Sequence, residues 1–143
     1  MMTIPVVVIT HGRSAIALCD SAKMIIGEQE HLYALEFLPG ENVEHILAKI
    51  SALKLTTPTL FLVDFSGGSP FNAAALYQRQ LSHTDTGDVV TGVNIPMLIN
   101  VLMERDEFSS VHQLSVFAKE TGINGIICMS IDFEFSTSDE EEL

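Results

Sequence analysis

The sequence predicts a doubly wound α/β fold with a mostly parallel sheet, and three observations support this class. Residues 6–9 and 59–63 are unbroken apolar runs of strand length, typical of strands buried on both faces. Helical apolar spacing follows these runs, as in residues 15–26. Strands and helices then alternate along the chain, and right-handed crossovers between them wind such units into one sheet.

The expected elements are defined by apolar periodicity and by turn residues. In chain order they are strand 6–9, helix 15–26, strand 32–37, helix 43–53, strand 59–63, helix 70–81, strand 89–93, helix 97–104, helix 111–122 and strand 126–135. The common strand order for this length is 2-1-3-4-5, which makes the first and third strands neighbours. We therefore expect the order 2-1-3-4, with the fifth strand formed near the C-terminus.

Capping residues mark the ends of several expected helices. Gly27 is a natural C-cap, and Asn42 can cap the helix that follows the Pro-Gly turn. Ser69 is the expected N-cap of the next helix, with Pro70 at its first position. Gly122 is expected to end the helix that begins near residue 111.

Length and composition indicate one globular domain. The chain has 143 residues, of which 47% are hydrophobic and 18% charged, and its formal net charge is −12. That charge argues against nucleic acid or an anionic membrane as a partner. No apolar stretch has the length of a membrane span, so we expect a cytoplasmic protein. Cys19 and Cys128, both in apolar settings, are expected to be buried free thiols.

Two polar residues end the two most apolar strands. His11 follows the first strand, and Asp64 follows the third. Because neighbouring parallel strands end at the same sheet edge, we expect these side chains to meet there. The carboxylate would accept a hydrogen bond from one imidazole nitrogen and leave the lone pair of the other facing outward. Such a histidine is a candidate nucleophile, rather than one that only hydrogen-bonds its loop.

The loop after Asp64 is suited to an anion. Gly67, Gly68 and Ser69 can present backbone N–H groups at a helix N-terminus, and Ser66 or Ser69 can add a hydroxyl. Phosphoryl transfer needs chiefly positioning and electrostatic stabilisation, so we expect neither a metal nor a cofactor. Thr10 and Arg13 flank the histidine. Each is a candidate contact to phosphate or to a partner, with strand packing and solvent exposure as the respective alternatives.

Longer motifs carry a family resemblance. They are Thr10-His11-Gly12, Gly27-Glu28, Pro39-Gly40-Glu41-Asn42, LFLVD with GGSPFNAA at residues 60–75, and GVNIPML at residues 92–98. With these motifs the chain resembles the enzyme IIA component of the mannose family of the bacterial phosphoenolpyruvate-dependent sugar phosphotransferase system. The resemblance covers about residues 3–127, and it implies a type-4 EIIA domain at residues 1–135 with an acidic tail at residues 136–143.

The resemblance also implies a function. His11 would accept a phosphoryl group from the carrier HPr and pass it to a IIB component, with Asp64 as its paired aspartate and the membrane IIC and IID components acting downstream. The family's last strand crosses between the subunits of a homodimer, a role that falls to residues 126–135. The chain stops at SDEEEL instead of continuing into a IIB domain, so we expect a free-standing IIA.

Three alternatives stay open at this stage. The same resemblance extends to a subunit that donates phosphate in a dihydroxyacetone kinase system. A regulatory phospho-sensor would use the same histidine. A non-enzymatic binding module on a flavodoxin-like fold is a more distant alternative, because fold alone does not define function.

Overall fold

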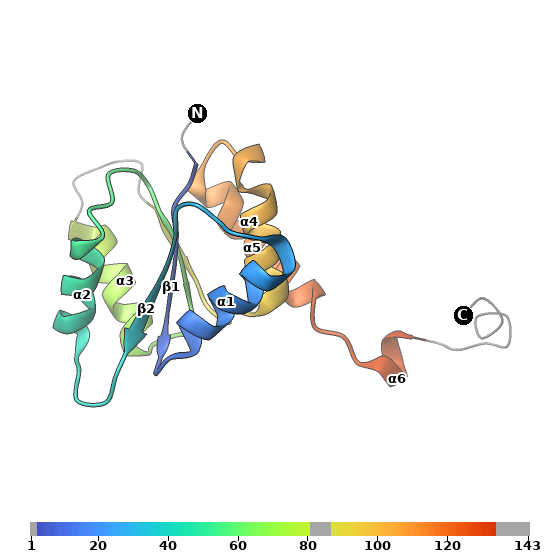
Figure 1. Ribbon diagram of the computed structural model, residues 1–143, viewed down its shortest axis with the longest axis horizontal. Coiled ribbons are helices and arrows are strands. Elements are labelled where there is room, and N and C mark those ends of the chain that lie inside the picture. The colour runs from blue at the N-terminus through green and yellow to red at the C-terminus, as the bar shows by residue number, and fades with distance from the viewer. Residues whose placement is uncertain (1–2, 81–86, 134–143) are drawn as a thin grey trace, which may run out of the picture.

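The computed structural model describes residues 3–80 and 87–133, and these form a parallel sheet with helices on both faces (Figure 1). Its strands lie in the order β2-β1-β3-β4, and all three pairings are parallel. They are β1 (Val6–His11), β2 (Leu32–Phe37), β3 (Leu60–Val63) and β4 (Asp88–Val90). The predicted fold class and the order of these four strands are confirmed.

Helices cover both faces of the sheet. In Figure 1, α2 and α3 lie on one side of the strands, and α1, α4 and α5 lie on the other. The helices are α1 (Ser14–Ile26), α2 (Val43–Ala52), α3 (Ser69–Gln80), α4 (Ile95–Glu104), the 3₁₀ turn η1 (Arg105–Glu107), α5 (Val111–Asn124) and α6 (Met129–Asp132). None of these helices is long and apolar enough to cross a membrane.

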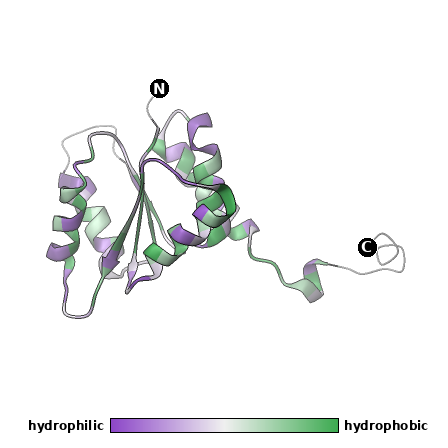
Figure 2. Ribbon diagram, viewed as in Figure 1, coloured by the Kyte–Doolittle hydropathy of each residue, from purple (hydrophilic) through white to green (hydrophobic). Residues whose placement is uncertain are grey.

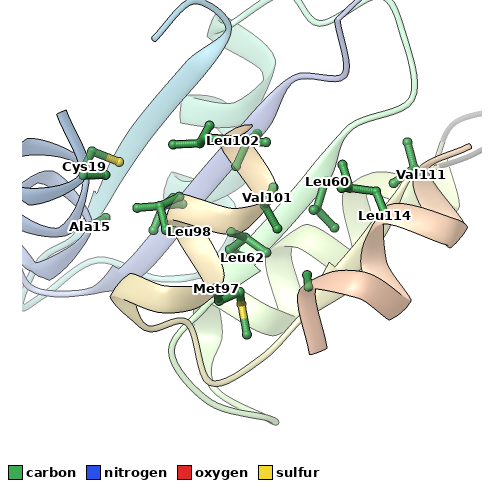
Figure 3. Close-up of a cluster of buried hydrophobic side chains, with 14 residues drawn as sticks. Ala15, Cys19, Leu60, Leu62, Met97, Leu98, Val101, Leu102, Val111 and Leu114 are labelled. Atoms are coloured by element: carbon green, nitrogen blue, oxygen red, sulfur yellow. The ribbon is translucent and has the colours of Figure 1, made fainter. Parts of the chain in front are cut away.

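The apolar runs of β1 and β3 are explained by the two-sided core. Val6 and Val8 pack in the cluster with α1, α4 and α5, which Figure 3 shows in close-up. Val7 and Ile9 pack on the opposite face against α2 and α3. All four side chains are fully buried, which explains why residues 6–9 are apolar on both faces of the strand. The central strands therefore form a rigid base for the residues at their carboxyl ends.

Several helix boundaries differ by a few residues from those predicted. Asn42 caps α2 as expected, through its side chain and the His45 backbone N–H. Ser69 is the first residue of α3, whereas the sequence suggested that it precedes the helix. Gly122 does not end α5, which continues to Asn124. A Cβ at residue 122 would lie 2.7 Å from Cε of Met97, so this glycine permits close packing of α5 on α4.

Strand β4 is shorter than the predicted strand 89–93. The regular ladder ends at Val90, and Gly92 has a positive φ of 74°. Gly92 and Val93 still donate backbone hydrogen bonds to Asp64 and Val63. The chain therefore stays beside β3 while it turns toward α4, without continuing the strand.

The strand predicted at residues 126–135 is not present in the described part of this segment. Met129–Asp132 forms the short helix α6, residues 126–128 have no regular structure, and residues 134–135 lie outside the described ranges, as does the predicted tail. Figure 1 shows residues 126–133 leading away from the sheet, and Figure 2 shows the stretch before α6 to be hydrophobic and α6 to be mixed. A strand needs a neighbour for its backbone groups, and this segment lies beside none of the four strands.

The two cysteines differ in environment. Cys19 lies on the buried face of α1, and burial raises the pKa of its thiol to about 11. It is therefore a packing residue, as predicted. Cys128 is exposed, which contradicts the expectation of a second buried thiol. The reason is the same as for the missing strand, because Cys128 belongs to the segment that lies away from the sheet.

Candidate functional site

His11 and Asp64 meet at the carboxyl edge of the sheet. His11 is the last residue of β1, and Asp64 directly follows the last residue of β3. The two strands pair in register with Ile9 opposite Val63, so β1 extends just far enough for His11 to reach the aspartate. The adjacency expected from the strand order is therefore present, across 53 positions of sequence.

Both carboxylate oxygens of Asp64 are engaged. Oδ2 lies 2.7 Å from Nδ1 of His11 and accepts the His11 backbone N–H at 2.8 Å. Oδ1 accepts the backbone N–H of Phe65 at 3.0 Å. Partial burial alone would raise the pKa of Asp64, but the hydrogen bonds from His11 and Phe65 outweigh it and hold the pKa below its usual value. Asp64 is therefore an anion at neutral pH.

An ionised Asp64 determines the tautomer of His11. A carboxylate can only accept, so Nδ1 carries the proton and donates it to Oδ2. Nε2 then keeps its lone pair. The His11 side chain is 44% exposed and that of Asp64 27%. The arrangement thus presents a neutral imidazole nitrogen to solvent with a charged group behind it, which is suited to nucleophilic attack.

The glycine loop lies directly beside the imidazole. Gly67 has a φ of 83°, a conformation that favours glycine. A Cβ at residue 68 would lie 3.0 Å from Cε1 of His11, so only glycine lets the backbone approach the ring this closely. Within residues 3–80 and 87–133, the N–H groups of Gly67, Gly68 and Ser69 donate no hydrogen bond. Free backbone N–H groups at a helix N-terminus are suited to an anion, and these lie beside His11 at the start of α3.

Ser66 and the two residues that flank His11 have different surroundings. Ser66 is exposed and also lines a groove beside β4. Thr10 is buried, and its Oγ1 accepts the backbone N–H of Ala15 at 2.7 Å, so it caps the start of α1. Arg13 is exposed and reaches Glu36, with 3.4 Å between Nε and Oε2. The geometry thus favours a structural role for Thr10 and leaves Arg13 at the surface near the site.

Two aromatic residues of the site were not predicted from the sequence. Phe65 stacks on the imidazole of His11, with ring centroids 5.1 Å apart and an interplanar angle of 20°. Phe37 meets the same ring edge to face, with centroids 5.3 Å apart. A signal for Phe37 existed, because it ends β2 opposite His11 in the ladder. Phe65 follows Asp64 directly, but it lies in a loop, so no strand pairing predicts which side chain it meets.

The site shows no metal-binding arrangement in the part of the chain that is described. No three His, Cys, Asp or Glu side chains lie close enough together there to hold an ion. The described residues offer an imidazole, a carboxylate bound to it, and a glycine loop whose backbone N–H groups are free. The fold and the site thus define an α/β protein that can carry an anionic group on a strand-terminal histidine.

Comparison with known proteins agrees with this class. The family model EIIA-man, described as "PTS system fructose IIA component", matches residues 5–118. The chain therefore belongs to the EIIA-man family, as its motifs suggested.

Relatives and solved structures support the same assignment. The chain is 45% identical over 129 residues to the mannose-specific EIIAB component of the phosphotransferase system (PTS) of Escherichia coli K12, covering 87% of this chain but only 39% of that protein. It is 36% identical to the fructose-specific EIIA component of Bacillus subtilis, covering 74% of this chain and 73% of that protein. The crystal structure of an EIIA component from Streptococcus agalactiae superposes with a TM-score of 0.82 at 25% identity, covering 89% and 98% of the two chains.

Proposed function

We propose that this protein is a phosphocarrier of a sugar phosphotransferase system and that His11 carries the phosphoryl group on Nε2. The observation that supports this most directly is the 2.7 Å contact between Nδ1 of His11 and Oδ2 of Asp64. That contact leaves Nε2 as the free nucleophilic atom and places a negative charge behind the ring. The mannose and fructose systems in the relatives' names favour sugar transport over the dihydroxyacetone alternative.

The proposed reaction exchanges one P–N bond for another. The lone pair of Nε2 attacks the phosphorus of phosphohistidine on HPr, the P–N bond of the donor breaks, and its electron pair returns to the donor imidazole. The His11 ring becomes cationic and keeps its Nδ1 proton, which Asp64 stabilises. In the second transfer an acceptor group of the IIB component attacks the phosphorus on Nε2. The P–N bond to His11 then breaks, and its electron pair returns to the His11 ring.

The glycine loop would hold the phosphoryl oxygens during both transfers. The N–H groups of Gly67, Gly68 and Ser69 are the proposed donors, because they lie beside the ring at the N-terminus of α3. The hydroxyls of Ser66 and Ser69 are further candidate donors. Arg13, exposed at the start of α1, is a proposed contact to a partner's carboxylate or to the phosphoryl group. We expect this relay to operate in the cytoplasm.

We also infer that the protein works as a homodimer in which residues 126–135 cross to the partner subunit. Strand β4 pairs only with β3 among the described strands, so its outer edge is available. Beside it lies a groove of about 660 Å³ lined by residues that include Val89, Val116 and Ile123. Ile127 and Ile131 in the C-terminal segment are 56% and 74% exposed and do not line this groove. An apolar segment and an apolar groove with an unpaired strand edge are complementary.

The relay function is tested by measuring the intact mass of the protein after incubation with phosphoenolpyruvate, enzyme I and HPr. We expect one added phosphoryl group on the wild type, labile to acid, and none on His11→Ala. Asp64→Asn should take up the group at least about 100-fold more slowly, because an amide can no longer balance the cationic ring. An unlabelled wild type in the presence of active phospho-HPr would overturn the proposal.

The extent of labelling also distinguishes carrier from substrate. A carrier returns the group, so addition of unphosphorylated HPr should remove it from His11 within the time of the forward reaction. A group that cannot be returned would point to a terminal phospho-sensor, the regulatory alternative.

A further inference from the structure

The imidazole of His11 is enclosed by four residues, one from strand β2 and three from the loop between β3 and α3. Asp64 binds its Nδ1 edge, Phe37 from β2 meets it edge to face, and Phe65 lies stacked over it. The backbone at Gly68 closes the Cε1 edge. The Nε2 edge is the one that none of these groups covers. Of the four neighbours, only Phe65 has no role in the proposed transfer or in the sheet.

Phe65 is unusual because it is a large apolar side chain at the surface that is nevertheless fixed. Its side chain is 54% exposed, so burial of its own surface does not explain its position. Its backbone N–H is bound by Oδ1 of Asp64, the same carboxylate whose Oδ2 holds His11. A Cβ at residue 68 would lie 3.1 Å from its Cζ, so the ring also rests against the glycine loop. One carboxylate thus holds both the imidazole and the backbone of the residue whose ring stacks on it.

This stack has consequences for the chemistry of the imidazole. A flat ring 5.1 Å away at 20° restricts rotation of the imidazole about its own axis and keeps water from that face. In the proposed reaction the imidazole goes from neutral to cationic when Nε2 bonds to phosphorus. The face of a phenyl ring attracts a cation more than a neutral group, so the stack stabilises the phosphorylated ring and the transition state more than the free ring.

We propose that Phe65 is a positioning residue for phosphoryl transfer, which aligns Nε2 of His11 and stabilises the cationic ring by stacking. The proposal rests on the proposed function. The competing explanation for an exposed phenylalanine beside an active histidine is a docking contact that only a partner protein uses. The two explanations predict different changes when the aromatic face is removed at nearly constant bulk.

The experiment compares Phe65→Leu, Phe65→Tyr and wild type, with Met24→Leu as a control for a surface apolar change. Met24 is 88% exposed on α1 and contacts neither His11 nor Phe65 in the described contacts. The rate of phosphoryl uptake is measured over a range of phospho-HPr concentrations. In parallel, ¹⁵N NMR of the unphosphorylated protein reports which nitrogen of His11 carries the proton.

We expect Phe65→Leu to lower the saturating rate about tenfold with the KM for phospho-HPr changed less than about twofold, in keeping with a partly desolvated cation–π contact. An imidazole that the stack no longer orients breaks its Nδ1 hydrogen bond to Asp64 for part of the time, so the ¹⁵N signals should show a larger fraction of the Nε2-protonated tautomer. Phe65→Tyr and Met24→Leu should both keep the wild-type saturating rate and the wild-type tautomer fraction. A raised KM with an unchanged saturating rate and unchanged ¹⁵N signals would overturn the proposal in favour of docking alone.

Failure of the proposed function would be seen separately. If wild-type protein accepts no phosphoryl group, the relay is wrong, but the NMR comparison needs no donor and still decides whether Phe65 orients His11. Unchanged tautomer fractions in Phe65→Leu would then reject the positioning role as well.

Discussion

The carboxyl edge of the sheet and the segment after α5 differ in whether their apolar residues are buried. At the edge, His11 and Asp64 follow strands whose side chains are fully buried, as Val8 and Leu62 illustrate. In residues 126–133, by contrast, Ile126, Ile131 and Phe133 are at least half exposed. The first region is built from residues of one chain, whereas the second has apolar surface that no element within residues 3–80 and 87–133 covers.

The difference shows which interactions the two regions need. The site depends on β1–β3 pairing and on the Asp64 carboxylate, both of which come from nearby strand ends of the same chain. The C-terminal segment has alternating apolar residues suited to a strand, but none of the four described strands lies beside it. The His11–Asp64 site should therefore keep its geometry when the oligomeric state changes. The C-terminal segment, in contrast, should determine the oligomeric state.

The largest expected effect comes from charge in the exposed segment. Ile127→Asp combined with Ile131→Asp should convert a dimer to a monomer, because two carboxylates cannot be buried in an apolar groove without partners. Sedimentation velocity measures the change, and Met24→Asp on the exposed face of α1 should leave the dimer intact. Alkylation of Cys128, exposed in the single chain, should be slow in the wild type and fast in the double variant.

A wild-type protein that sediments as a monomer at all concentrations would contradict this expectation. Rapid alkylation of Cys128 in the wild type would agree with that outcome, because the segment would then be uncovered. Cys19 provides an internal reference, since burial raises the pKa of its thiol to about 11 and it should react only on unfolding.

A smaller effect is expected from a single methyl group at the site. Gly68→Ala places a Cβ 3.0 Å from Cε1 of His11 and 3.1 Å from Cζ of Phe65, so one of these rings must shift. We expect phosphoryl uptake to slow roughly tenfold, since a displacement of less than an ångström misaligns the attacking atom. The thermal unfolding midpoint should change little because both rings lie at the surface. An unchanged rate would mean that the loop yields and the ring position does not matter.

The carboxyl edge of the sheet was largely predictable from the sequence, and the segment after α5 was not. The fold and the meeting of His11 with Asp64 were predictable because buried parallel strands have a strong apolar signal and end at a common edge. Gly122 was misread as a helix end because the sequence does not show Met97 packing against it. Phe65 was missed because its stack on His11 depends on loop geometry. Residues 126–133 form no strand here because a strand needs a second strand to pair with. The apolar pattern of this segment predicts a strand but does not show which segment would pair with it.

The proposed transfer depends most on Asp64, which binds Nδ1 of the imidazole and leaves Nε2 as the reactive atom. The most direct test is NMR of the phosphorylated, ¹⁵N-labelled protein, in which coupling to ³¹P identifies the nitrogen that carries phosphorus. We predict phosphorus on Nε2 of His11 and a proton on Nδ1. Phosphorus on Nδ1 would require the contact to Asp64 to break and would contradict the account.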